Sequence, residues 1–163
     1  MYGFNQQLKE GEQQEQKLDA FFARWYNIQP VAMDMQRLGI DRLFTRRDNG
    51  HVFKIEYKSD WTASKTGNAF VETVSVDTPH TPGWVYSSQA DYLIYYLPKA
   101  MRAYIIAFEN LRVRLPQWTK FPTRSIPNQG YNTVGLLVPL AEIERVAKQV
   151  VYLDESSATS ENG

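Results

Sequence analysis

One short turn constrains the fold of this chain more than any other feature. It is Asp48-Asn49-Gly50, which lies between two apolar-patterned runs. Asn-Gly at such a place is typical of a β-hairpin. The runs from Gly39 to Phe44 and from His51 to Lys58 are therefore predicted to be antiparallel strands joined by this turn.

The hairpin is predicted to gather charged side chains on one face. Side chains alternate across a strand, so Ile55 and Tyr57 share one face while Glu56 and Lys58 share the other. Strand pairing across the turn can bring Asp41 near Glu56. Two carboxylates and a lysine would then meet on one face of the hairpin.

Such a trio suits phosphodiester hydrolysis. Carboxylate oxygens hold Mg²⁺ or Mn²⁺, and the metal lowers the pKa of a bound water and offsets charge on the phosphate. Lys58 can position that water and stabilise the transition state. The alternative is a solvated sheet face, since Lys54, Glu56 and Lys58 alternate as such faces do.

The remaining patterns predict an α/β (α+β) chain with one mixed central sheet flanked by helices. Apolar residues at helical spacing from Leu18 to Trp25 indicate an amphipathic N-terminal helix over Glu15 to Tyr26. A three-strand meander follows, completed by a strand over Ala69 to Asp77. Further strands are expected over 90–97, 103–108 and 133–138, with helices over 110–118 and 141–150.

The hairpin motif resembles that of a known superfamily. Gly39-Ile40-Asp41 is followed fifteen residues after the aspartate by Glu56-Tyr57-Lys58. With a helix before it and further α/β elements after it, this pattern resembles the PD-(D/E)XK nucleases. Ile40 stands where the motif's name has a proline, a departure that is common in that superfamily.

The resemblance implies a restriction-endonuclease-like or Holliday-junction-resolvase-like fold and a Mg²⁺- or Mn²⁺-dependent deoxyribonuclease, most naturally an endonuclease. It implies that Asp41 and Glu56 are metal ligands and that Lys58 is the catalytic lysine. It also implies that the backbone carbonyl of Tyr57 completes the metal shell. A competing function is a non-catalytic nucleic-acid-binding or scaffold protein on the same fold.

Two more carboxylates are candidate metal ligands. Glu72 shares an apolar strand face, where a carboxylate is costly unless it is paired or bound to a metal. It could join the metal or pair with Lys54 or Lys58. Glu15 is in register with Leu18 on the first helix, and first-helix glutamates bind metal in some relatives. The alternative for Glu15 is a solvated residue at a helix end.

Several residues are candidate contacts to nucleic acid. Lys65 and Asn68 lie in a polar loop after the motif and could contact phosphate oxygens, or could belong to an ordinary surface loop. Arg42 flanks Asp41, and Arg112 and Arg114 belong to a basic stretch. A basic surface beside a carboxylate cluster is what a phosphodiester substrate requires.

Aromatic residues in loop-rich segments offer a further contact. Trp61, Trp84 and Tyr86 could stack on bases if they are exposed, although aromatic residues more often belong to the core.

The charge distribution is compatible with a DNA partner. The chain has 163 residues, with 18 basic and 18 acidic residues. The acidic ends hide a body, residues 18–153, with 16 basic and 12 acidic residues, a net of +4. We expect a polar N-terminal tail over 1–14, a single nuclease-like domain over 15–153 and a disordered acidic tail over 154–163.

The absence of cysteine excludes disulfides, thiolate nucleophiles and cysteine-based zinc sites. It suits a cytoplasmic protein. No apolar run approaches the length of a membrane span, so we expect no membrane partner. The small size favours either a resolvase-like homodimer or a domain that takes its specificity from partners.

Overall fold

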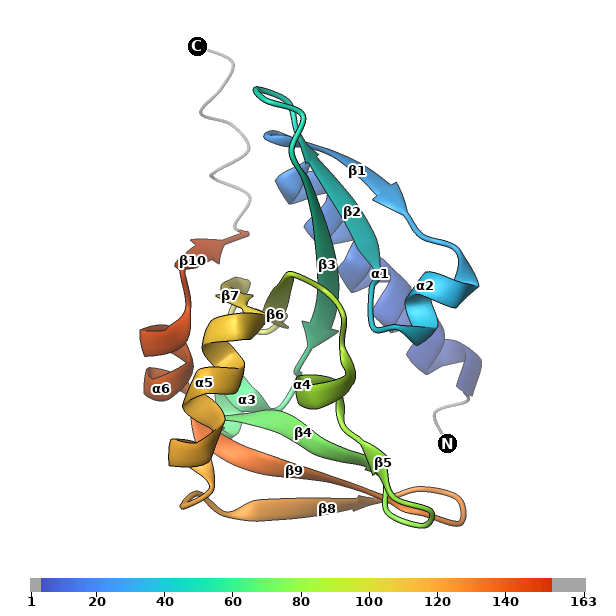
Figure 1. Ribbon diagram of the computed structural model, residues 1–163, viewed down its shortest axis with the longest axis vertical. Coiled ribbons are helices and arrows are strands. Elements are labelled where there is room, and N and C mark those ends of the chain that lie inside the picture. The colour runs from blue at the N-terminus through green and yellow to red at the C-terminus, as the bar shows by residue number, and fades with distance from the viewer. Residues whose placement is uncertain (1–3, 154–163) are drawn as a thin grey trace.

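The computed structural model describes residues 4–153, which form helices packed on two β-sheets (Figure 1). The helices in this range are α1 (Phe4–Phe22), α2 (Met33–Arg37), α3 (Ala63–Thr66), α4 (Trp84–Ser87), α5 (Phe108–Trp118) and α6 (Leu140–Val146). The strands are β1 (Tyr26–Pro30), β2 (Arg42–Arg46), β3 (Val52–Ser59), β4 (Asn68–Val76), β5 (Thr81–Pro82), β6 (Tyr92–Leu97), β7 (Arg102–Ala107), β8 (Thr123–Pro127), β9 (Asn132–Pro139) and β10 (Gln149–Tyr152). None of these helices meets the length and apolarity that a membrane crossing needs.

The larger sheet has the strand order β1-β2-β3-β6-β7-β10. Strands β3 and β6 are parallel, and the other neighbours are antiparallel. After α1, strands β1, β2 and β3 form a meander at one edge of this mixed sheet. The predicted fold class, an α+β chain with an N-terminal helix and a mixed sheet flanked by helices, is confirmed, and a second, four-stranded sheet accompanies the predicted one.

The predicted hairpin is also confirmed. Strands β2 and β3 pair with Arg42 opposite Ile55 and Phe44 opposite Phe53. Gly50 has a φ of +73° in the turn, a conformation that glycine adopts without a steric penalty. Its N–H donates to the Arg46 carbonyl at 2.9 Å. The turn therefore fixes the register that positions the motif.

The third strand of the meander is not the one expected. The segment Tyr26–Pro30, predicted to end the first helix, forms edge strand β1 and pairs with β2. The segment predicted over Ala69 to Asp77 is a strand, β4, but it pairs with β5 and β9 in a separate sheet. Proline suits an edge strand because Pro30 has no N–H to leave unpaired there.

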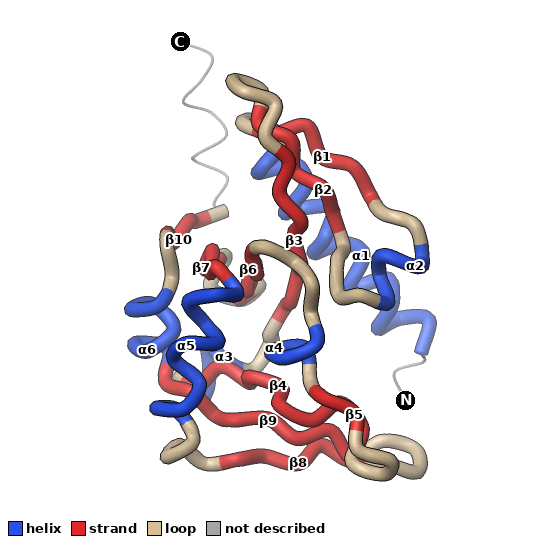
Figure 2. Tube along the Cα trace, viewed as in Figure 1, coloured by secondary structure: helices blue, strands red, loops and turns tan. Residues whose placement is uncertain are grey.

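The smaller sheet has the order β5-β4-β9-β8 and lies across one end of the larger sheet (Figure 2). The predicted helix over 141–150 is shorter than expected, because α6 ends at Val146 and β10 follows. Helix α1 begins at Phe4 and so includes most of the segment 1–14 that we assigned to a tail. The predicted acidic tail over 154–163 lies outside the described residues.

Two apolar cores lie on opposite faces of the larger sheet. Helix α1 covers one face, where Leu18 and Phe22 pack against Phe44, Ile55 and Tyr57. Helices α4 and α5, together with residues of the smaller sheet, form the core on the other face. Strand β3 thus presents alternate side chains to two different environments, as the alternation in its sequence predicted.

Candidate active site

The Gly39-Ile40-Asp41 segment is a turn that leads into β2. Gly39 has a φ of +75°, and a Cβ placed there would lie 2.8 Å from the Ser88 backbone. The Ser88 hydroxyl donates to the Gly39 carbonyl at 2.7 Å. Ile40 is buried in the core on the α4 and α5 side. The strand predicted from Gly39 therefore begins only at Arg42, because the preceding residues anchor the chain to the end of α4.

Asp41 lies directly before β2, at the end of the hairpin opposite the turn. Its N–H donates to the Ile55 carbonyl at 2.8 Å. Its carboxylate oxygen Oδ2 accepts a hydrogen bond from the Tyr57 N–H, also at 2.8 Å. These bonds hold the Asp41 carboxylate against the segment from Glu56 to Lys58. The hairpin therefore brings the residues of the motif together.

The backbone carbonyl of Tyr57 lies on the same side of β3 as the Asp41 carboxylate. In an antiparallel pair the N–H and C=O of one residue point to the same side of the strand. Because the Tyr57 N–H reaches Asp41, its carbonyl also lies on the β2 side of β3. The β2–β3 pairing ends at Arg42 and Ile55, so this carbonyl lies beyond the last residue pair of the hairpin.

Glu56 is a buried carboxylate, only 4% exposed. Its Oε1 lies 3.3 Å from Lys58 Nζ, whereas its buried Oε2 has no hydrogen-bond partner among the described residues. Burial raises the pKa of Glu56; Lys58 and the nearby Ser88 lower it by less, and the Asp41 charge raises it further. An unpartnered buried oxygen is costly, and a bound cation or water would remove that cost.

Lys58 lies near the end of β3 with its side chain partly exposed. The charge of Lys58 also acts on Glu72, which comes from β4 of the smaller sheet. Burial raises the pKa of Glu72, and the charge of Lys58 opposes that shift. Glu72 Oε1 accepts a hydrogen bond from the Trp84 N–H at 3.2 Å. Lys58 therefore interacts with carboxylates from both sheets.

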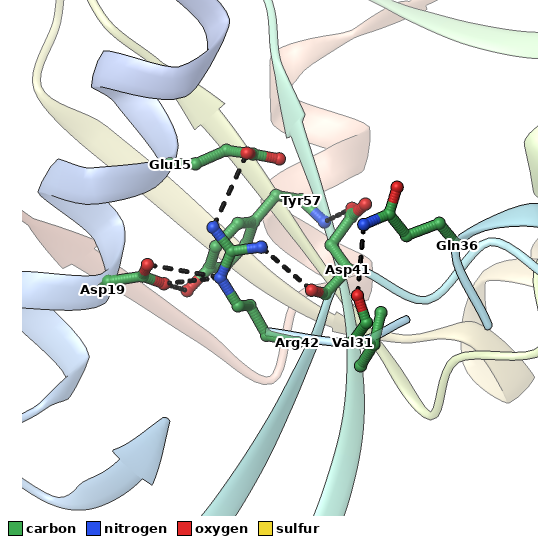
Figure 3. A network of polar contacts seen from close by, with 7 residues as sticks. All are labelled: Glu15, Asp19, Val31, Gln36, Asp41, Arg42 and Tyr57. Carbon is green, nitrogen blue, oxygen red and sulfur yellow. Dashed lines mark hydrogen bonds and ion pairs between the residues drawn. The ribbon is translucent and has the colours of Figure 1, made fainter. Parts of the chain in front are cut away.

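A second polar network lies on the α1 face of the sheet (Figure 3). Arg42 Nε is 3.1 Å and 3.2 Å from the two carboxylate oxygens of Asp19, and Arg42 Nη2 is 3.6 Å from Glu15 Oε2. The guanidinium also donates to the backbone carbonyl of Asp41 at 2.9 Å. The Tyr57 hydroxyl donates to Asp19 at 2.8 Å. The network ties α1 to both strands that carry the motif.

This network defines the surroundings of two candidate residues. Arg42, predicted to contact DNA, has a side chain only 14% exposed and is paired with carboxylates of α1. Glu15, a candidate metal ligand, lies beside Arg42, and burial raises its pKa more than Arg42 lowers it. The DNA contact of Arg42 and the metal contact of Glu15 stay predictions. No motif in the sequence marks Asp19 as a member of this network, so its role was not predicted.

The residues of the motif fit a hard divalent cation. Within residues 4–153, no three His, Asp or Glu side chains gather as a ready-made metal cluster. Mg²⁺ does not need one, because it keeps several waters and binds through one or two carboxylates. Asp41 and Glu56 could supply two carboxylates and the Tyr57 carbonyl a third oxygen, and Glu56 Oε2 has no hydrogen-bond partner among residues 4–153.

The other predicted DNA contacts lie in different places. Lys65 is exposed on α3, and Asn68 lines a cleft beside Lys58. Arg114 hydrogen-bonds Gln117 on the same helix, α5.

Arg112 instead holds α4 against α5, because its guanidinium donates to the carbonyls of Val85 and Ser88. Arg124 on β8, which was not among the predicted DNA contacts, lines the cleft beside Lys58. Its place there depends on the pairing of the smaller sheet, which the sequence pattern did not reveal. The DNA contacts of Arg112 and Arg114 stay predictions.

Comparison with known proteins yields little. No family model matches the chain, and no curated protein matches its sequence. Among solved structures, a bacterial homing endonuclease aligns with 58% of this chain at 21% identity and a TM-score of 0.40. The alignment spans 61% of that endonuclease, less than two thirds of its length. At this level of likeness we base the proposed function on the side-chain geometry alone.

Proposed function

We propose that this protein is a metal-dependent nuclease that hydrolyses phosphodiester bonds in DNA as an endonuclease, with Mg²⁺ or Mn²⁺. One observation carries the proposal. The Asp41 carboxylate is fixed by the Tyr57 N–H, next to a buried Glu56 whose Oε2 lacks a partner and whose Oε1 is paired with Lys58. These are the groups that a cation and a phosphate would require at one place.

In this proposal Asp41, Glu56 and the Tyr57 carbonyl hold the ion. The bound ion would acidify a water and offset negative charge on the phosphate. Lys58, held by Glu56, donates hydrogen bonds that orient the attacking water and stabilise charge on the phosphate. The negative charge of Glu72 offsets part of the positive charge of the neighbouring Lys58 before DNA binds.

The alternative is a non-catalytic DNA-binding or scaffold protein with the same fold. Such a protein would gain nothing from a buried carboxylate oxygen without a partner, which destabilises the fold. A carboxylate whose pKa is shifted by burial and by a specific charged partner is a candidate for a functional site. The state of Glu56 therefore favours the enzyme.

A cleavage assay tests the proposal. Supercoiled plasmid, single-stranded DNA and branched DNA are incubated with the full chain in Mg²⁺, in Mn²⁺ or in EDTA. We expect cleavage of at least one DNA that requires the metal, is lost in Glu56→Gln and is strongly reduced in Lys58→Ala. Glu144→Gln, which alters an exposed carboxylate on α6, is the matched control and should cleave like the wild type.

Two results would overturn the proposal. One is that the folded wild type cleaves none of these DNAs with either metal. The other is that Glu56→Gln cleaves at the wild-type rate, which would indicate a contaminating nuclease. Binding of the same DNAs without cleavage would favour the non-catalytic alternative.

A further inference from the structure

A cleft of about 420 Å³ lies beside Lys58 and is open to solvent. It is formed where the end of β3 and α3 meet the smaller sheet. Lys58 belongs to its wall, but Asp41 and Glu56 do not. The cleft therefore adjoins the proposed active site through Lys58, and its wall also includes Glu72, the candidate metal ligand on β4.

The walls of the cleft combine an aromatic face with cations, carboxylates and small polar groups. Trp61 is 41% exposed, and its ring makes none of the aromatic stacking contacts found within residues 4–153. Lys58 enters from the larger sheet and Arg124 from the smaller one. The other polar side chains on the walls are those of Ser59, Asp60, Thr62, Thr66, Asn68, Glu72 and Tyr95, so two carboxylates accompany the two cations.

The loop that carries Trp61 is held rigidly. Asp60 Oδ1 accepts hydrogen bonds from the N–H groups of Thr62 and Ala63, at 3.0 Å and 2.9 Å. Asp60 Oδ2 accepts from the Tyr95 hydroxyl and from the Phe70 N–H. One carboxylate thus ties the loop to α3, β4 and β6. Because these bonds anchor the backbone on either side of Trp61, less of the loop would have to be ordered on binding.

The volume of the cleft and the residues on its walls indicate which ligand it binds. A volume of 420 Å³ falls within the range of small-ligand sites, so the cleft accommodates a nucleotide but not a duplex. Aromatic faces bind bases by stacking, and cations bind the flanking phosphates. A base inside a duplex has both faces covered by its neighbours, so only an unpaired or extruded base can reach Trp61.

We propose that this cleft binds one unpaired nucleotide of a DNA substrate, with its base on Trp61 and its phosphates between Lys58 and Arg124. The inference rests on the proposed function, because Lys58 would contact the phosphate that is cleaved. It adds a substrate class: the protein acts where a nucleotide is unpaired, as in a gap, a loop or a branch, in preference to continuous duplex.

Binding measurements test the cleft without cleavage. Anisotropy titrations in the Glu56→Gln background compare two labelled DNAs of equal length, one fully paired and one with a single unpaired nucleotide. Trp61→Ala should weaken binding of the second DNA about tenfold and leave the paired duplex within about twofold. Tyr152→Ala is the matched control, because Tyr152 on β10 is an exposed aromatic, 58% exposed, outside the cleft walls. Trp61→Phe should restore most of the affinity.

Each result bears on the inference. Equal weakening for both DNAs, no weakening, or the same weakening in Tyr152→Ala would overturn it. If the wild type cleaves DNA but Trp61→Ala binds normally, the nuclease proposal stands and the cleft inference fails. If nothing is cleaved but Trp61 still discriminates the unpaired nucleotide, the cleft inference stands and the nuclease proposal fails.

Discussion

The two faces of strand β3 carry charged groups in opposite states. On the α1 face, Arg42 is paired with Asp19, and the Tyr57 hydroxyl completes the contacts of that aspartate. On the other face, Glu56 is more deeply buried than Arg42 or Asp19, yet its Oε2 has no hydrogen-bond partner among the described residues. Tyr57 and Glu56, adjacent residues of β3, thus belong to two polar networks. The hydrogen bonds of the first are satisfied, and those of the second are not.

This difference between the two faces of β3 indicates a separate role for each. A satisfied polar network connects elements, here α1 to the hairpin, and needs nothing from outside the chain. An unsatisfied buried carboxylate beside a lysine is poised for a ligand that the chain itself does not supply. We therefore expect substitutions on the α1 face to alter stability and substitutions on the Glu56 face to alter activity.

The largest expected effect is on catalysis. Lys58→Ala should lower the rate of metal-dependent DNA cleavage about a hundred- to ten-thousand-fold, because the attacking water and the phosphate lose their donor. The thermal midpoint should also fall, because the buried Glu56 loses its paired cation, so the rates are compared at a temperature where both proteins are folded. The measurement is the single-turnover rate at saturating Mn²⁺.

The control for this variant is Lys99→Ala, which alters an exposed lysine in the turn after β6. It should cleave at the wild-type rate. A Lys58→Ala protein that cleaves as fast as this control would remove Lys58 from the mechanism.

The next effect is on stability, from the opposite face. Asp19→Asn leaves Arg42 and Tyr57 without their charged acceptor, and we expect a loss of about 2 kcal/mol in the free energy of unfolding. Urea denaturation measures it. The exposed Arg46–Asp48 pair offers a matched control: Asp48→Asn should leave the unfolding curve unchanged, because water solvates both partners. Equal losses in the two variants would contradict the account of this network.

The smallest effect has the opposite sign. Glu56→Gln should stabilise the metal-free protein by about 1 kcal/mol at neutral pH, because it removes a buried charge with an unpartnered oxygen. Urea denaturation in EDTA measures this gain. A destabilised variant at neutral pH would show that the Glu56 charge is well compensated.

The gain disappears in acid. The pKa of Glu56 is raised in the folded protein above its ordinary value of 4.5, so protonation favours the folded state. The contribution of Glu56 to stability is favourable below about pH 4.5 and is lost as the pH rises through the folded pKa. The advantage of Glu56→Gln should therefore vanish in acid. An advantage that is constant with pH would exclude a titrating Glu56 as its cause.

The sequence predicted the hairpin because the determinants of the hairpin are local. Asn49 and Gly50 fix the turn, and the alternation from Phe53 to Lys58 then fixes which side chains share a face. The position of Asp41 beside the motif follows from the same register. Turn chemistry and period-two alternation are both readable from a few residues.

Two parts of the structure were not predictable in this way. Strand β1 is short, carries a proline and lies at the sheet edge, so its sequence has little strand signal. The partner of β4 is β9, more than sixty residues away, as in the bond from Thr73 to the Val134 carbonyl. Pairing over such a separation leaves no local pattern, and the cleft lined by Arg124 depends on it.

The central claim is that the unsatisfied face of β3 is a cation site. Isothermal titration of Mn²⁺ into the full chain, without DNA, tests it most directly. We predict saturable binding in the wild type and in Glu144→Gln, and loss of that binding in both Asp41→Asn and Glu56→Gln. Binding that is unchanged in Asp41→Asn and Glu56→Gln, or absent from the folded wild type, would contradict the claim.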